Sequence, residues 1–184
     1  MNTFNRTEFL KSVQYYLNNE SGYMFRVGLH QNRLQCLTEF LLSTSNHTML
    51  LLNQKFFEPL NHLLEKNTPS RSKIELIITP DVLNPQNHDV LMHLQKHRHL
   101  YVIDDNDIPC SMIFNNKSSL MQTQKESFLC CLNPDYNYDR IQHLNFLTRS
   151  FNHLTQVGHL VTPKLITKYS SLNIDELGNF YSRQ

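Results

Sequence analysis

Short, strongly apolar runs alternate with amphipathic segments through the middle of the chain, and this alternation constrains the fold more than any other feature. The runs HTMLLLN (47–53), KIELIIT (73–79) and LYVID (100–104) have the length and apolarity of strands buried within a sheet. The two segments between them, 56–67 and 85–97, place apolar residues at helical spacing. A repeated strand–helix–strand pattern predicts parallel strands joined by right-handed crossovers.

The flanking segments add further helices and a hairpin. Helices are predicted at 7–19, 31–44, 135–157 and 163–170, with Thr7 as the N-cap of the first. In the helix 56–67, Pro59 suits the first turn. Strands are expected at 23–27, in a hairpin within 103–122 and at 126–133. The predicted fold class is therefore α/β, with a mixed, largely parallel sheet flanked by helices.

Composition and charge narrow the range of partners. The formal net charge is +1, and the Lys and Arg residues are scattered along the chain. Nucleic-acid binders usually carry a basic excess or stripe, so nucleic acid is predicted to be an unlikely partner. There is no run of 18 apolar residues and the N-terminus is polar, which predicts no membrane partner and a cytoplasmic location. We attribute the high Asn content to coding bias, so by itself it indicates neither a function nor disorder.

Three segments together carry a family resemblance: SRSKIELIITPDVL (70–83), HLYVIDDNDIPCSMIFNNKSSLMQ (99–122) and ESFLCCLNPDYNYDRIQHLNFLTRSFNHL (126–154). They resemble one half of a phospholipase D-like fold, in particular the degenerate, non-catalytic versions in small bacterial proteins and in effector domains of archaeal transcription regulators. The resemblance implies a phospholipase D-like domain at 29–160. An N-terminal helix and short strand (1–28) would precede it, and a C-terminal helix and tail (161–184) would follow. It also implies a homodimer, because such half-domains pair about a two-fold axis.

Active members of that family carry His-x-Lys, in which the His attacks phosphorus and the Lys holds the phosphoryl oxygens. The equivalent stretch here, IPCSMIFNNKS (108–118), offers Cys110 or Ser111 instead, and none of the ten His residues has Lys two places later. We therefore expect a non-enzymatic regulatory, ligand-binding or scaffolding module without a cofactor. One alternative is a phosphodiesterase or nuclease with relocated, metal-dependent chemistry. Another is a nucleic-acid-binding regulator.

The candidate site residues are few. Tyr136, Tyr138 and Asp139 lie in a turn before a helix and are candidates to line a ligand cleft near the hairpin, although a capping and docking loop is the favoured interpretation. His93 and His97 are four residues apart on one helical face, the spacing of paired metal ligands, but Leu94 stands where a zinc hydrolase needs Glu. No metal site is therefore predicted.

The aromatic residues are expected to serve the core. Six phenylalanines occupy positions predicted to be buried: Phe56, Phe57, Phe114, Phe128, Phe146 and Phe151. A stacking surface made from them is the less favoured interpretation.

Overall fold

A computed structural model of the chain describes residues 4–17, 24–28, 30–66, 73–97, 99–105, 108, 110–123, 125–132 and 138–171. The helices are α1 (Arg6–Leu17), α2 (Gln31–Thr44), α3 (Gln54–Lys66), α4 (His88–His97), α5 (Tyr138–Val157) and α6 (Pro163–Ser170), and two 3₁₀ turns, Pro80–Val82 and Pro85–Asn87, precede α4. The strands are β1 (Met24–Arg26), β2 (His47–Leu52), β3 (Lys73–Ile78), β4 (His99–Val102), β5 (Ser111–Phe114), β6 (Ser118–Gln122), β7 (Ser127–Cys131) and β8 (His159–Leu160).

The strands form one sheet in the order β1-β7-β6-β5-β2-β3-β4-β8. The pairings β2–β3 and β3–β4 are parallel, as the repeated strand–helix–strand pattern predicts. The other five described pairings are antiparallel. The mixed α/β fold is thus confirmed, but the sheet is less parallel than expected, because β1, the hairpin strands, β7 and β8 all join it in antiparallel fashion.

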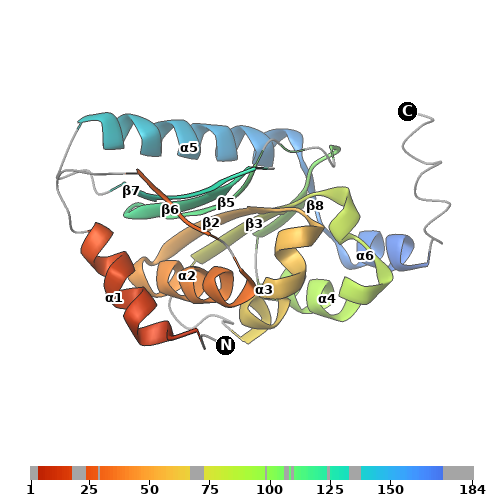
Figure 1. The fold of residues 1–184 in the computed structure, drawn as a ribbon. Helices are drawn as coiled ribbons and strands as arrows, with labels where there is room; N and C mark the ends of the chain where they lie inside the picture. The colour runs from red at the N-terminus through yellow and green to blue at the C-terminus, as the bar shows by residue number, and fades with distance from the viewer. Residues whose placement is uncertain are drawn as a thin grey trace.

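Helices cover both faces of the sheet (Figure 1). In the described part of the chain, α5 lies on one face, and α1, α2, α3, α4 and α6 lie on the other. Both crossover helices, α3 and α4, share a face because the strand order β2-β3-β4 proceeds in one direction with right-handed connections. None of the helices among these residues is long and apolar enough to cross a membrane.

Two hydrophobic clusters, one on each face, hold these layers together. The strand β2 is buried from Thr48 to Leu52, so its side chains pack alternately into the two clusters. Leu50 belongs to the cluster under α2, α3 and α4, whereas Leu51 belongs to the cluster under α5. On the α5 side, Leu147 and Phe151 pack against the sheet, and the Phe151 ring meets the Phe114 ring edge-on, with ring centroids 5.8 Å apart.

Two N-termini differ from the predicted ones. The first helix is capped by Asn5, whose Oδ1 accepts hydrogen bonds from the backbone N–H groups of Thr7 and Glu8, so Thr7 lies inside the helix. The helix α3 begins at Gln54, earlier than predicted, because Asn53 caps it through its Oδ1 and its carbonyl oxygen. Pro59 therefore lies in the second turn of α3 and not in the first.

One of the six phenylalanines predicted to be buried is not. Phe56, Phe57, Phe114 and Phe151 are buried and Phe128 is half-buried, but Phe146 is 67% exposed. The side of α5 that faces the sheet carries Leu144, Leu147, Phe151 and Leu154, and Phe146 lies one residue before Leu147, about 100° away around the helix. The periodicity that buries its neighbours therefore turns Phe146 towards solvent.

The double-sided burial of β2 gives a testable prediction. Replacing Leu50, which is fully buried, with Ala should lower the free energy of unfolding by about 2–5 kcal/mol, because it removes methyl groups from a packed interior. Leu160→Ala in β8 is the matched control: Leu160 is 58% exposed, so the change should be within about 0.5 kcal/mol. Urea denaturation measures both, and equal losses would contradict the assignment of β2 to the core.

Candidate functional site

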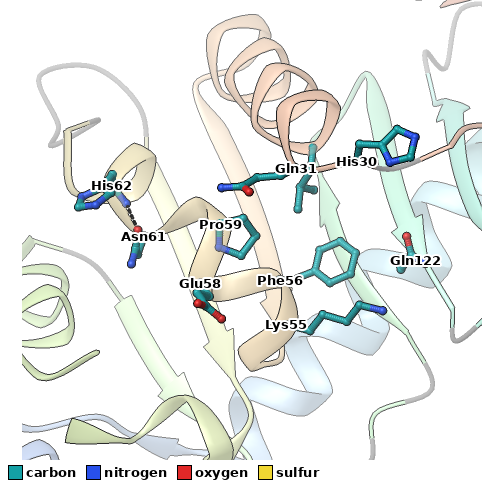
Figure 2. A pocket seen from close by; sticks show the side chains of 10 residues that line it. His30, Gln31, Lys55, Phe56, Glu58, Pro59, Asn61, His62 and Gln122 are labelled. Carbon is teal, nitrogen blue, oxygen red and sulfur yellow. Dashed lines mark hydrogen bonds between the residues drawn. The ribbon is translucent and has the colours of Figure 1, made fainter. Parts of the chain in front are cut away.

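A groove opens between α2, α3 and the end of β6, and we call it the α2–α3 groove (Figure 2). Its volume of about 620 Å³ is in the range of small-molecule sites. The apolar part of its wall consists of Leu34, Phe56 and Pro59, and polar side chains surround it: His30, Lys55, Glu58, Asn61, His62 and Gln122. Figure 2 shows Lys55 and Gln122 on one side of the groove and Asn61 and His62 on the other.

A single hydrogen bond ties the two helices together at this groove. Gln35 of α2 donates from its Nε2 to the carbonyl oxygen of Pro59 at 2.7 Å. The exposed side chains of the groove include Lys55 and Glu58, which lie one helical turn apart on α3 and carry opposite charges. This balance suits a small polar molecule and is less suited to a polyanion, which Glu58 would repel.

A second cavity lies beside the turn that joins β5 to β6, and we call it the hairpin cavity. Its volume is about 630 Å³. It is lined by residues 43–47 and Met49, by Asn116 and Lys117 in the turn, and by Leu144 and Thr148 of α5. It therefore brings together the amino end of β2, the hairpin and the helix on the α5 face.

Asn115 builds the hairpin and is fully buried. Its Oδ1 accepts hydrogen bonds from the backbone N–H groups of Lys117 and Ser118, at 2.8 and 3.0 Å, which forms an Asx turn. Its Nδ2 donates to the carbonyl oxygen of Leu41 at 2.8 Å. One side chain thus folds the turn and fixes it against the end of α2, and this positions Asn116 and Lys117 at the cavity.

A charged cluster lies next to the hairpin cavity. Glu75 of β3, whose side chain is 16% exposed, accepts a hydrogen bond from His47 Nε2 at 2.9 Å and forms an ion pair with Lys73. Burial by itself raises the pKa of the Glu75 carboxyl, but the hydrogen bond and charge of Lys73, together with His47, outweigh it and lower the pKa overall. Glu75 is therefore ionised, and its charge is balanced locally.

The outer face of α5 is polar and carries no carboxylate between Arg140 and Val157. Its exposed side chains are Gln142, Asn145, Phe146, Arg149, Asn152, His153, Gln156 and Val157. The absence of acidic residues continues in the sequence to Ser171. This stretch without Asp or Glu is visible in the sequence and marks the surface. The net charge and the scattered positions of Lys and Arg do not reveal it.

The site residues predicted from sequence mostly stay untested. Tyr136 lies outside the described residues, and Tyr138 and Asp139 begin α5 but their side chains are not described. His93 is half-buried in α4, and the side chain of His97 is not described. No group of three or more His, Cys, Asp and Glu within the described ranges could hold a metal ion.

Cys110 and Ser111, which the family resemblance predicts at the position of the nucleophile, lie at the start of β5. Cys110 is half-buried, and burial raises the pKa of its thiol, so it is protonated at neutral pH and is a weak nucleophile. Ser111 begins β5, and its hydroxyl oxygen accepts a hydrogen bond from the backbone N–H of Asn53 at 3.4 Å. Both side chains therefore serve the packing of the strand ends.

Comparison with known proteins gives a likeness of fold only. The chain matches no known protein family, and no curated protein is similar to it in sequence. Among solved structures it is similar to TrmBL2, an archaeal chromatin protein described as showing a novel mode of DNA binding. The TM-score is 0.58 at 12% sequence identity, over 85% of this chain. The chain spans 61% of the length of the TrmBL2 chain.

This likeness corrects one prediction. Nucleic acid was predicted to be an unlikely partner because the net charge is only +1. The comparison overturns that prediction, because a chain of similar fold belongs to a DNA-binding protein. Net charge averages over the whole surface, whereas contact with DNA depends on the charges of one face.

The Asn115 hydrogen bonds lead to a prediction about the hairpin. Asn115→Ala leaves the N–H of Ser118 and the carbonyl of Leu41 without this partner. At about 1–3 kcal/mol for each of these two groups, the free energy of unfolding should fall by about 2–6 kcal/mol. Asn116→Ala, in the exposed part of the same turn, should cost much less. Thermal and urea denaturation measure the difference, and a small effect of Asn115→Ala would argue against its role in the turn.

The lowered pKa of Glu75 predicts a pH-dependent contribution to stability. Because the pKa is lower in the folded state, the stabilisation is fully present above the ordinary value of 4.5 and disappears as pH falls through the lowered value. Glu75→Gln should therefore destabilise the protein at neutral pH and have little effect in strong acid. Glu58→Gln, at an exposed position without a described ion pair, should leave the urea midpoint nearly unchanged at both pH values.

Proposed function

We propose that this chain is a DNA-binding regulatory module on a phospholipase D-like scaffold, without catalytic activity and located in the cytoplasm. The observation that carries the proposal is the likeness of fold to TrmBL2, a DNA-binding chromatin protein, over 85% of this chain. The scaffold is supported by the order of elements, since β3, α4, β4, the β5–β6 hairpin, β7 and α5 follow one another as the resemblance of residues 70–83, 99–122 and 126–154 implies. Residues 29–160 would be the corresponding domain.

The outer face of α5 is the surface that we assign to DNA. The helix has 20 residues, so it is about 30 Å long, and it lies apart from the other described helices (Figure 1). An α-helix of this kind fits the major groove of DNA. Asn145 and Asn152 carry amides of the type that pairs with adenine, and Arg149 can bind a phosphate or a guanine edge.

Charge distinguishes this face from the α2–α3 groove. The exposed residues of α5 between Arg140 and Val157 include Arg149 and no carboxylate, so nothing in that stretch repels a phosphate backbone. The groove carries both Lys55 and Glu58, and its volume of about 620 Å³ is in the range of small-molecule sites. As a regulatory module, the chain would take a small polar ligand in the groove and DNA on α5.

A charge reversal on α5 tests the proposal. Arg149→Glu should weaken binding to a short labelled DNA duplex by about tenfold at low salt, because it replaces a phosphate contact by a repulsion. Lys96→Glu on α4 is the matched control, since α4 lies on the opposite face of the sheet, and it should change the affinity little. Fluorescence anisotropy measures both variants. If both lose binding equally, the α5 surface is wrong, and if the unmodified chain binds no duplex even at low salt, the proposed function is wrong.

A further inference from the structure

Among the residues that the structure describes, the lining of the hairpin cavity contains hydroxyl, amide, imidazole and ammonium groups but no carboxylate. The α2–α3 groove contains Glu58, and a third cavity, beside α1, contains Glu39. The hairpin cavity thus differs from the other two in presenting hydrogen-bond donors without a competing negative charge. Such a lining matches a phosphate group, which accepts several hydrogen bonds and carries negative charge.

Three of these groups are available to a ligand. Asn116 accepts a hydrogen bond from Ser45 Oγ at 3.1 Å through its Oδ1, and this orients the amide so that its amino group points away from Ser45. Its amino group has no acceptor among the described residues, and neither has the Lys117 ammonium, which forms no ion pair with any of them. The hydroxyl of Thr148 is likewise without a described partner.

One described carboxylate that contacts the cavity wall, that of Glu75, is already neutralised. Glu75 is engaged by Lys73 and by His47, and His47 lies in the cavity wall. The cluster therefore adds little repulsion, while Lys117 adds a positive charge. The cavity wall includes Thr148 of α5, and the next residue, Arg149, lies on the outer face about 100° further around the helix.

We propose that the hairpin cavity binds a backbone phosphate of the DNA that lies along α5, with Lys117 and Asn116 as the main donors and Thr148 as a third. This inference rests on the proposed function and deepens it, since it adds a specific anchoring point to a helix surface. We assign the phosphate to the DNA backbone and not to a free phosphate ester, because Thr148 in the cavity wall belongs to the helix along which the DNA would lie.

The test is the salt dependence of binding to a short duplex, measured by fluorescence anisotropy between about 50 and 200 mM salt. Loss of one phosphate contact should lower the slope of log K against log salt by about 1 in the Lys117→Ala variant. Lys125→Ala is the matched control, because Lys125 is exposed in the turn between β6 and β7, at the other end of β6 from Lys117. The slope of this variant should equal that of the unmodified chain.

A second variant keeps the turn intact. Asn116→Asp retains an acceptor for Ser45 Oγ but replaces the amino donor with a charged oxygen, so it should also weaken DNA binding. The alternative source of phosphate is tested by adding inorganic phosphate without DNA and recording the amide NMR signals of residues 116 and 117. Saturation at millimolar phosphate, with unchanged DNA slopes in Lys117→Ala, would overturn the backbone assignment in favour of a free phosphate.

The outcomes separate the two proposals. Normal DNA binding with equal slopes in Lys117→Ala and Lys125→Ala would overturn the phosphate site and leave the α5 surface standing. Absence of DNA binding by the unmodified chain would overturn both. A slope lowered in Lys117→Ala alone, together with weaker binding by Asn116→Asp, would support the site.

Discussion

The burial of β2 and β3 on both faces is the constraint on which the rest of the structure depends. A strand such as MLLL in β2 sends alternate side chains into two separate clusters, so helices must cover each side of the sheet. The crossover helices α3 and α4 cover one side as a consequence of connectivity. The other side is covered by α5, which follows β7. Because α5 packs through Leu147 and Phe151, its opposite surface remains free for other uses.

Much of the fold follows from apolar periodicity. The buried runs of β2 and β3 and the amphipathic segments beside them were predicted at nearly their observed bounds, because burial of apolar residues dominates the energy of these elements. The predicted helix starts are wrong at positions where side-chain hydrogen bonds, and not the burial of apolar residues, determine where the helix begins. Asn5 and Asn53 fix two helix starts, and Asn115 fixes a turn, although the Asn content was attributed to coding bias. A strong N-cap displaces a helix start that periodicity alone places later.

The candidate sites were less predictable, because they depend on which distant residues share a face. Phe146 was predicted to be buried from its apolar character, but its angular position on α5 exposes it. The cavity beside the hairpin joins Lys117 to Thr148 of α5, and no local pattern in the sequence connects them. The absence of acidic residues from Arg140 to Ser171 is visible in the sequence. It indicates a binding surface only once α5 is known to be the one described helix on its side of the sheet.

The two ends of the sheet differ from its centre in length. The strand at one end, β1, has three residues and the strand at the other end, β8, has two, whereas the central strands β2 and β3 have six each. An edge this short offers few unpaired backbone groups as a template for a strand from another molecule. The long apolar strands β2 and β3 have a paired strand on each side. The segments most prone to aggregation are therefore also the least accessible to a strand from another molecule.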